Sequence, residues 1–388
     1  MPLANSLVRA EERDAPEPRY PLDLGFCPAC SLVQIGETIP PETLFREYVY
    51  FSSFSETMLA SSEALARRLV RERGLGADSL VVELASNDGY LLQFYRDLGV
   101  PILGVEPALN VAKVAEARGI PTVAEFFGDA LAARLVRESR RADVIHANNV
   151  LAHVADLNGF VRGVALLLKE TGVAAIEVPY VRDLVEGAAF DTIYHEHLCY
   201  FSLTALEALF GRHGLAIQDV ERIPIHGGSL RLFVGRAANR SESLRAMLLD
   251  ERERGLDRLD YYLGLAEKAA AVKQRLRDLL HDLKGRGARI AAYGAAAKGA
   301  TLLNYCALGA ETIEYVVDRS EHKQGRSMPG VGLPIRSPDV LLDDPPDYVL
   351  ILPWNLADEI VRQQAAYRAQ GGRFILPVPD PRVVEASP

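Results

Sequence analysis

The sequence predicts two α/β domains, each built on a largely parallel sheet, preceded by a small irregular module. Two observations predict this architecture. Short apolar strands alternate with helices twice along the chain, and a glycine-containing turn follows the first strand of each alternation. Such alternation implies parallel sheets, because a parallel pair of strands needs a crossover connection. At 388 residues the chain has the length of two to three domains.

The first alternation is followed by a hairpin. Two strands, 215–225 and 229–236, are separated by three residues, so they must run antiparallel. A helix is expected before them at 203–214. Five parallel strands, a helix and a terminal antiparallel hairpin are typical of a class I methyltransferase sheet. The five strands are expected at 79–85, 101–106, 120–126, 142–150 and 173–181, and residues 182–202 are expected to be irregular.

These patterns divide the chain into four parts. Residues 1–55 are Pro-rich and irregular, with one Cys-x-x-Cys motif, and 56–240 form the first α/β domain. Residues 241–285 are charged and heptad-like without a strand signal, which predicts a helical linker. The second strand-helix alternation, at 286–388, predicts a doubly wound C-terminal α/β domain.

Composition excludes several classes of protein. A hydrophobic content of 49% and a charged content of 24% are those of a globular protein. The net charge of −9 and the absence of a Lys/Arg block disfavour a nucleic-acid partner. No apolar run reaches the roughly 18 residues of a membrane span, and the N-terminus lacks the apolar region of a signal peptide. Four cysteines are too few for a disulfide framework, so we expect reduced thiols and a cytoplasmic location.

The turn after the first strand is acidic. Asp88 and Glu83 are placed to bind a cationic amino-acid tail, and Gly89 lets the backbone approach a ligand. Glu106 ends the second strand, near the position of the acid that binds ribose hydroxyls in dinucleotide folds. The loop lacks G-x-G-x-x-G and would repel phosphate, which favours S-adenosylmethionine (SAM) over NAD; the alternative is that these acids cap a helix. The predicted cofactor-binding residues are Glu83, Ala85, Asn87, Asp88, Gly89, Glu106, Pro107, Asn148 and Asn149.

A proton-transfer cluster is predicted at the same edge of the sheet. Residues 194–197 read Tyr-His-Glu-His, and His153 follows the fourth strand. A histidine accepts a proton near neutral pH because its pKa is about 6.5. Structural histidines and a His-x-His metal site are the alternatives, and a metal site would have only His153 and Glu196 as further ligands. The predicted catalytic residues are Tyr194, His195, Glu196, His197 and His153.

Two glycine turns suggest contacts with the substrate. The turn at 226–231 needs its glycines but has no conformational need of His226 or Arg231. The turn at 294–299 places Lys298 at a helix N-terminus, which suits a diphosphate, although close packing of helix on sheet explains the glycines equally well. The predicted substrate-binding residues are His226, Arg231 and Lys298 in these turns, and Glu177 and Tyr180 at the end of the fifth strand.

Together these motifs resemble a known family, the SAM-dependent C-methyltransferases of nucleotide-linked keto-deoxysugars in antibiotic sugar pathways. The resemblance covers nearly the whole chain. It implies an N-terminal zinc-binding module, a central methyltransferase domain and a C-terminal α/β domain, with the sugar held between the last two. The motifs that carry it are at 48–55, 83–89, 104–107, 148–156, 177–180, 194–202, 226–231, 294–299 and 352–355.

The resemblance implies residue roles and a reaction. His197 matches the base, His153 an active-site histidine, and Tyr48 or Tyr50 a tyrosine that contacts the sugar. His197 would remove a proton from the carbon beside a ketone, which the family link makes carbon 3 of a nucleotide-linked 4-keto-deoxysugar. Tyr194 or His153 would stabilise the enolate before methylation. The alternatives are methylation of a hydroxyl or of a non-sugar small molecule, and a non-catalytic nucleotide-sugar-binding protein.

The N-terminal module departs from the family pattern. The family site has two Cys-x-x-Cys pairs, and here Cys27 and Cys30 form the one pair present. Two thiolates do not close a four-coordinate zinc site, so zinc is not expected. Residues 1–5 match the segment that follows the missing pair, which indicates a gene start placed too late or a decayed module.

Overall fold

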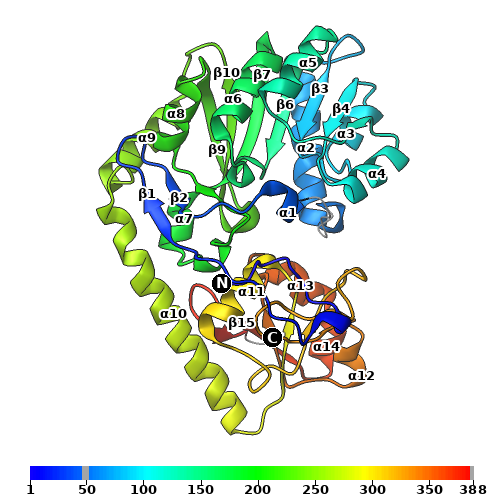
Figure 1. The fold of residues 1–388 in the computed structure, drawn as a ribbon, viewed down its shortest axis with the longest axis vertical. Helices are drawn as coiled ribbons and strands as arrows, with labels where there is room; N and C mark the ends of the chain where they lie inside the picture. Colours follow the sequence, from blue (N-terminus) through cyan, green and yellow to red (C-terminus); the bar gives the residue numbers. More distant parts are fainter. Residues whose placement is uncertain (46–51, 385–388) are drawn as a thin grey trace.

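The computed structural model describes residues 1–45 and 52–384 and contains two α/β lobes (Figure 1). The larger lobe holds a seven-stranded sheet and the smaller one a six-stranded sheet. The N-terminus lies where the two lobes meet, and the long helix α10 (Asp260–Gly285) runs alongside both (Figure 1). The predicted sugar-contacting residues Tyr48 and Tyr50 lie outside the described residues.

The seven-stranded sheet confirms the predicted class I methyltransferase topology. Its order is β5-β4-β3-β6-β7-β10-β9, with the first five strands parallel and β10 antiparallel to both of its neighbours. The central strand β3 is buried along its whole length, as expected of a sheet covered on both faces. The strands are β3 (Val81–Leu84), β4 (Ile102–Val105), β5 (Thr122–Val123), β6 (Ala142–Asn148), β7 (Leu168–Pro179), β9 (Ala216–Ile223) and β10 (Ser229–Gly235).

Some helices of this lobe begin at polar caps. Ser55, Asp156 and Ser202 each accept a hydrogen bond from a backbone N–H of the first helical turn. The helices of this lobe and its lead-in are α1 (Pro41–Phe45), α2 (Glu56–Arg73), α3 (Leu92–Asp97), α4 (Leu109–Ala117), α5 (Asp129–Arg137), α6 (Leu157–Leu167), α7 (Val181–Glu186) and α8 (Leu203–Gly211).

A third, small sheet was not expected. The hairpin of β1 (Leu24–Phe26) and β2 (Val33–Ile35) pairs with β8 (Cys199–Tyr200), which comes from the stretch predicted to be irregular. The same stretch also contains most of α7, so that prediction is wrong in part. A two-residue strand and a six-residue helix are too short to produce a periodic signal in the sequence. The consequence is that the N-terminal module packs directly onto the Tyr-His-Glu-His segment.

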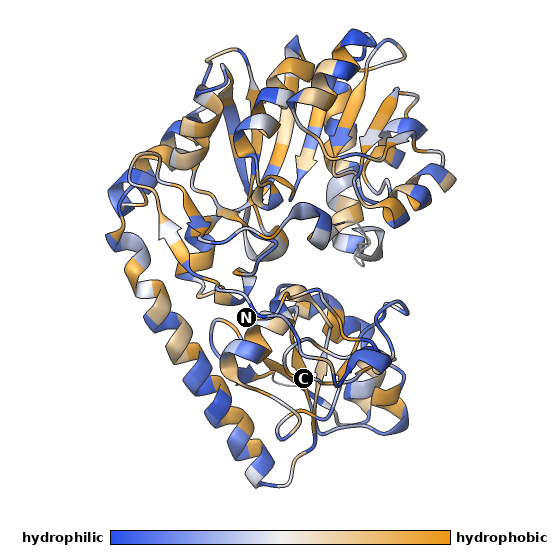
Figure 2. Cartoon of the chain, viewed as in Figure 1, coloured by the Kyte–Doolittle hydropathy of each residue, from blue (hydrophilic) through white to orange (hydrophobic). Residues whose placement is uncertain are grey.

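Two helices occupy the predicted linker, α9 (Glu242–Arg254) and α10. The buried face of α10 comprises Leu265, Ala269, Val272, Leu276, Leu280 and Leu283, spaced three or four residues apart as an amphipathic helix requires. Its remaining surface is largely polar, whereas the strands inside both lobes are apolar (Figure 2).

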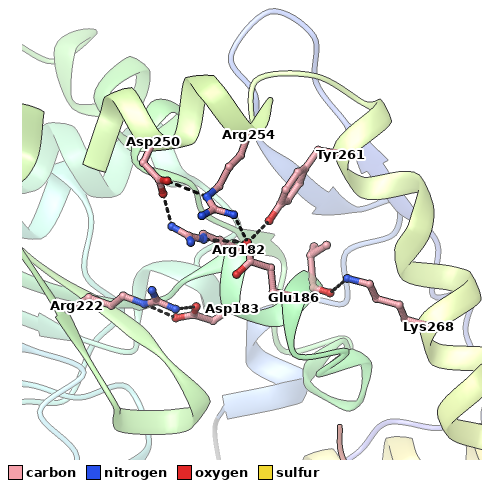
Figure 3. A network of polar contacts seen from close by, with 9 residues as sticks. Arg182, Asp183, Glu186, Arg222, Asp250, Arg254, Tyr261 and Lys268 are labelled. Carbon is pink, nitrogen blue, oxygen red and sulfur yellow. Dashed lines mark hydrogen bonds and ion pairs between the residues drawn. The ribbon is translucent and has the colours of Figure 1, made fainter. Parts of the chain in front are cut away.

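Ion pairs attach these helices to the larger lobe (Figure 3). Arg182 in α7 bonds to Asp250 in α9 and to Glu186, and Arg254 bonds to both of these carboxylates. Lys268 in α10 donates to the carbonyl of Val185 at 2.9 Å. Ion pairs near the surface contribute little individually, but these share partners and form a network around the largely buried Arg182.

The C-terminal lobe contains the second parallel sheet, as predicted. Its order is β13-β12-β11-β14-β15-β16, with the last strand antiparallel. Within residues 1–45 and 52–384, no helix is both long and apolar enough to cross a membrane. The elements are β11 (Ile290–Tyr293), α11 (Ala297–Cys306), β12 (Val316–Val317), β13 (Ile335–Arg336), α12 (Val340–Asp343), β14 (Tyr348–Ile351), α13 (Ala357–Gln363), α14 (Ala365–Ala369), β15 (Arg373–Leu376) and β16 (Arg382–Val383).

Candidate active site

The turn after β3 has a conformation suited to a ligand at the carboxyl edge of the sheet. Ala85, Asn87 and Gly89 all have positive φ, of 53°, 49° and 79°. A Cβ at Gly89 would lie 2.6 Å from Cγ1 of Ile120, so only glycine fits there. Left-handed residues of this kind are costly, and they concentrate at ligand sites.

Glu106 supports this turn from the end of β4. Its Oε2 accepts from the backbone N–H of Asn87 at 2.9 Å, and its Oε1 accepts from that of Ala108 at 2.8 Å. Pro107 lies between the carboxylate and the second donor. Glu106 therefore fixes the conformation of the loop through these two hydrogen bonds. A carboxylate has about four lone pairs, so the remaining ones can still accept hydrogen bonds from ribose hydroxyls.

Two serines just before α2 bind the same turn. The backbone N–H of Ser52 donates to Oδ1 of Asn87 at 2.9 Å, and Ser53 hydrogen-bonds to the buried carboxylate of Asp88. Arg118 pairs with the same Asp88 carboxylate at 2.9 Å. Sequence reasoning missed Arg118, whose position after α4 carries no motif.

Two buried amide oxygens at the carboxyl edge of the sheet could accept hydrogen bonds from a cofactor. The Oδ1 atoms of Asn148 and Asn149 are buried, and within the described part of the chain neither has a hydrogen-bond partner. Asn149 also has a positive φ of 54°. Burial, reinforced by the carboxylates of Asp88 and Glu106, holds the pKa of Glu83 well above its usual range. A cationic, hydrogen-bonding ligand such as SAM fits these groups, because it would satisfy the amides and offset the excess of acid.

Replacing Gly89 by Ala tests whether this turn binds the cofactor. We expect weaker SAM binding and a loss of stability of about 1–2 kcal/mol or more, because the new Cβ meets both an unfavourable φ and Ile120. The matched control is Gly99→Ala, which has a φ of 74° but no atom within 4 Å of the new Cβ. Calorimetric titration with SAM should separate the two variants, and equal SAM affinity in both would contradict a role for the turn.

The best-formed catalytic geometry is a histidine-tyrosine pair. Nδ1 of His197 lies 2.7 Å from the carbonyl oxygen of Thr192, and Nε2 lies 2.9 Å from the hydroxyl of Tyr194. A carbonyl only accepts hydrogen bonds, so Nδ1 carries the proton and Nε2 presents its lone pair. Both rings are half-buried, which leaves them accessible. The Thr192 carbonyl thus orients His197, a contact that sequence reasoning missed.

His153 connects this pair to the cofactor side. Its ring lies against that of His197 with the centroids 4.8 Å apart and the planes at 68°. Burial lowers the pKa of His153 to about 4, against the effect of hydrogen bonds to the backbone of Glu196 and Asn149. His153 is therefore neutral near pH 7, and it joins the 194–197 segment to Asn149 at the end of β6.

His195 and Glu196 face the N-terminal segment. His195 donates from Nε2 to the carbonyl of Pro21 at 2.9 Å, and Glu196 accepts two hydrogen bonds from Asn5. Both side chains are almost fully buried. Sequence reasoning placed them in the catalytic cluster but missed Asn5, because nothing local links residues so far apart.

Arg231 and Glu177 form a buried ion pair within the sheet. They stand opposite each other on β10 and β7, and Nε of Arg231 lies 2.7 Å from Oε1 of Glu177. The other guanidinium nitrogens contact Glu221 at 3.4 Å and Ser61 at 2.9 Å. Tyr180, at the start of α7, is also buried. Through these contacts Arg231 and Glu177 hold neighbouring elements of the lobe together. Their role in substrate binding stays a prediction.

The C-terminal lobe contacts the stretch just before Tyr194 through Trp354. Its indole N–H donates to Oδ2 of Asp191 at 2.7 Å, one residue before Thr192. Lys298 donates to Asn355 at 2.8 Å and lies over the Trp354 ring, 4.4 Å from its centroid. Burial lowers the pKa of Lys298, against the attraction of Asp191. For His226 the structure describes only the backbone, in a short 3-10 turn.

The cysteine pair lies at the tip of the β1–β2 hairpin. Cys27 and Cys30 are half-buried free thiols, and hydrogen bonds from the backbone of Ala29 and from Cys30 lower the pKa of Cys27. Among the described residues, no group of three or more His, Cys, Asp or Glu side chains is placed to hold a metal ion.

Known families and a curated protein are similar to this chain along most of its length. Three family models match: "Putative zinc binding domain" at 1–45, "Methyltransferase domain" at 58–220 and "C-methyltransferase C-terminal domain" at 224–379. The chain is 36% identical to C-methyltransferase NovU of Streptomyces niveus, over 99% of this chain and 92% of that protein.

Solved structures also match the chain, at low identity. Magnesium protoporphyrin IX methyltransferase from Synechocystis PCC 6803 with bound SAM matches at 13% identity and a TM-score of 0.36, covering 46% of this chain and 79% of that one. The PH0226 protein from Pyrococcus horikoshii matches at 16% identity and a TM-score of 0.39, covering 50% of this chain and 97% of that one.

Proposed function

Since this chain belongs to the family of SAM-dependent C-methyltransferases that includes NovU, we propose that it methylates carbon 3 of a nucleotide-linked 4-keto-deoxysugar. The observation that carries the proposal is the Tyr194–His197 pair. An imidazole whose Nε2 lone pair faces a phenol is equipped to remove a proton, and alkylation of carbon requires that step.

The proton transfer is assigned to His197. Its Nε2 takes the proton from the carbon next to the ketone, and the carbonyl of Thr192 stabilises the imidazolium through Nδ1–H. The Tyr194 hydroxyl, which donates to Nε2 in this structure, turns to the ketone oxygen when the acceptor binds; this frees the Nε2 lone pair for the proton and places a donor where negative charge develops. Neutral His153, in contact with the His197 ring, is the second candidate donor to that oxygen.

The methyl donor is held on the other side of this cluster. When bound, SAM supplies an electrophilic methyl group to the carbanion. Residues of the β3 turn, Glu106 and the two asparagines after β6 are proposed to hold it, because they combine acid, buried amides and a backbone that admits a ligand. The hydrogen bonding of His153 to Asn149 and Glu196 keeps donor and base at a fixed separation.

The acceptor is proposed to enter between the lobes. Lys298 at the N-terminus of α11 is suited to a diphosphate, and Trp354 offers an aromatic face beside it. The predicted contacts of Tyr48, Tyr50 and His226 belong to the same proposal.

Mass spectrometry tests the proposal. The protein is incubated with SAM and a panel of nucleotide-linked 4-keto-deoxysugars in deuterated water. We expect a product heavier by one methyl group, and deuterium beside the ketone even without SAM, because proton removal precedes methylation. Methylation of a hydroxyl, without exchange at carbon, would contradict carbon chemistry. Exchange and methylation absent across the panel, despite SAM binding, would exclude these sugars as acceptors.

A further inference from the structure

The N-terminal segment, residues 1–21, lies against the segment that carries the base. Nδ2 of Asn5 is 2.8 Å from both Oε1 and Oε2 of Glu196. The carbonyl of Pro21 accepts from His195, and the ring of Tyr20 packs edge-on against His195 with centroids 5.8 Å apart. Two consecutive catalytic-cluster residues are thus held by a part of the chain that precedes both lobes.

The carboxylate of Glu196 depends on Asn5. Glu196 is 3% exposed, and in the described part of the chain Asn5 is the one residue that donates hydrogen bonds to it. The amide nitrogen of Asn5 lies equally close to both oxygens, and this shared contact suits the ionised carboxylate, because a carboxylic acid would itself present a hydrogen on one of them. Burial raises the pKa of Glu196 to about 7, and the hydrogen bonds from Asn5 oppose that rise.

Among the described residues, the other titratable groups near the 194–197 segment do not interact with the Glu196 carboxylate. His153 contacts the backbone of Glu196, and its side chain does not pair with the carboxylate. The Met1 amino group and Glu37 act on His195. Further titratable groups nearby are Tyr194, His195 and His197 on the segment itself, Tyr20 on the N-terminal segment, and the buried Cys199 and Tyr200 on β8, and over residues 1–45 and 52–384 none of them is paired with the Glu196 carboxylate. Asn5 is therefore the group that opposes burial in setting the charge of Glu196.

We propose that Asn5 is a positioning residue of the active site, which holds the Glu196 carboxylate ionised and keeps the 194–197 segment in place. This inference rests on the proposed function in so far as His197 is the base. Glu196 is adjacent to His197 in the chain. If Glu196 were protonated and lost its hydrogen bonds to Asn5, the backbone between Tyr194 and His197 would lose an anchor, and the contact between these two side chains would loosen. The N-terminal module is then part of the catalytic site irrespective of any metal.

The direct test measures the charge of Glu196 and does not require activity. The protein is labelled with ¹³C at the glutamate carboxyl carbons, and the Glu196 signal is assigned by its loss in Glu196→Gln. We expect this signal to titrate near pH 7 in the wild type. In Asn5→Ala the midpoint should rise by about one to two pH units, because a hydrogen bond to the charged form is lost.

Matched variants make the titration decisive. Asn5→Asp has the shape of asparagine without its donors and adds a like charge, so it should raise the midpoint at least as much as Asn5→Ala. Glu17→Ala removes another anchor of the N-terminal segment, the contact of Glu17 with the backbone N–H of Gly330 at 2.7 Å, and should leave the midpoint unchanged. An unchanged midpoint in both Asn5 variants, or the same rise in Glu17→Ala, would overturn the proposal.

The activity profile then tests positioning. At pH 7, Asn5→Ala should be about 5- to 50-fold slower in methyl transfer, in proportion to the lost ionised fraction, and should recover as the pH rises. A loss that is equal at every pH would contradict the assignment. If no keto sugar is methylated by the wild type, the proposed function fails, while the carboxyl titration still decides the role of Asn5.

Discussion

Replacing His197 by Ala is expected to lower methyl transfer by about 10²- to 10⁴-fold, the contribution of a positioned general base. The variant removes the Nε2 lone pair that faces Tyr194 and the Nδ1–H that binds Thr192. SAM binding should stay nearly unchanged, because the groups assigned to the cofactor lie on the β3 turn and at the end of β6. Steady-state kinetics and calorimetric titration with SAM measure the two effects separately.

The matched control for this variant is His213→Ala. His213 follows α8, and its ring hydrogen-bonds to Asn158 at 3.0 Å, away from the catalytic segment. We expect its activity to equal that of the wild type. Exchange of the acceptor's hydrogen with solvent, measured without SAM, should be lost in His197→Ala and kept in the control. Retention of most of the activity in His197→Ala would show that another group removes the proton.

Replacing Arg231 by Ala is expected to destabilise the fold by about 3–5 kcal/mol, because a buried carboxylate loses its partner. Glu177 is 2% exposed and pairs with Arg231 across two central strands. The free energy of unfolding in urea measures this cost. Replacing both residues, as Arg231→Met with Glu177→Leu, should cost less than the single change, since no unpaired charge remains.

An exposed ion pair is the control for Arg231. Arg162 and Asp129 lie 3.0 Å apart with side chains 50% and 48% exposed. Arg162→Ala should cost less than about 1 kcal/mol. If Arg231→Ala is as stable as this control but has a raised KM for the acceptor, Arg231 contacts the substrate as the sequence predicted.

Much of the fold follows from local patterns. The alternation of apolar strands and helices between residues 79 and 236 predicted the seven-stranded sheet, including the antiparallel hairpin. The linker was predicted from its charged heptads, and α10 buries one face of them. In contrast, β8 was missed, because two residues carry no period and the strand exists only through its pairing with β2.

In the candidate site, too, some features were predicted from the sequence and others were found only in the structure. The sequence indicated that Tyr194, Glu196 and His197 belong to one cluster, since they are adjacent and follow the parallel strands. It did not indicate that Thr192 orients His197 or that Asn5 holds Glu196. The sequence predicted a substrate contact for Arg231 because it follows a glycine turn that does not require an arginine, and it did not predict the ion pair with Glu177.

By itself, the sequence determined the two α/β units, the edge of the sheet where polar residues gather and the kinds of side chain present there. These are local properties, because hydrophobic period and the ends of strands are written in neighbouring residues. Only the tertiary structure decided the partner of each polar group. Hydrogen bonds and desolvation depend on which remote segments meet, and Asn5 and Glu196 are 191 residues apart in the chain yet share two hydrogen bonds.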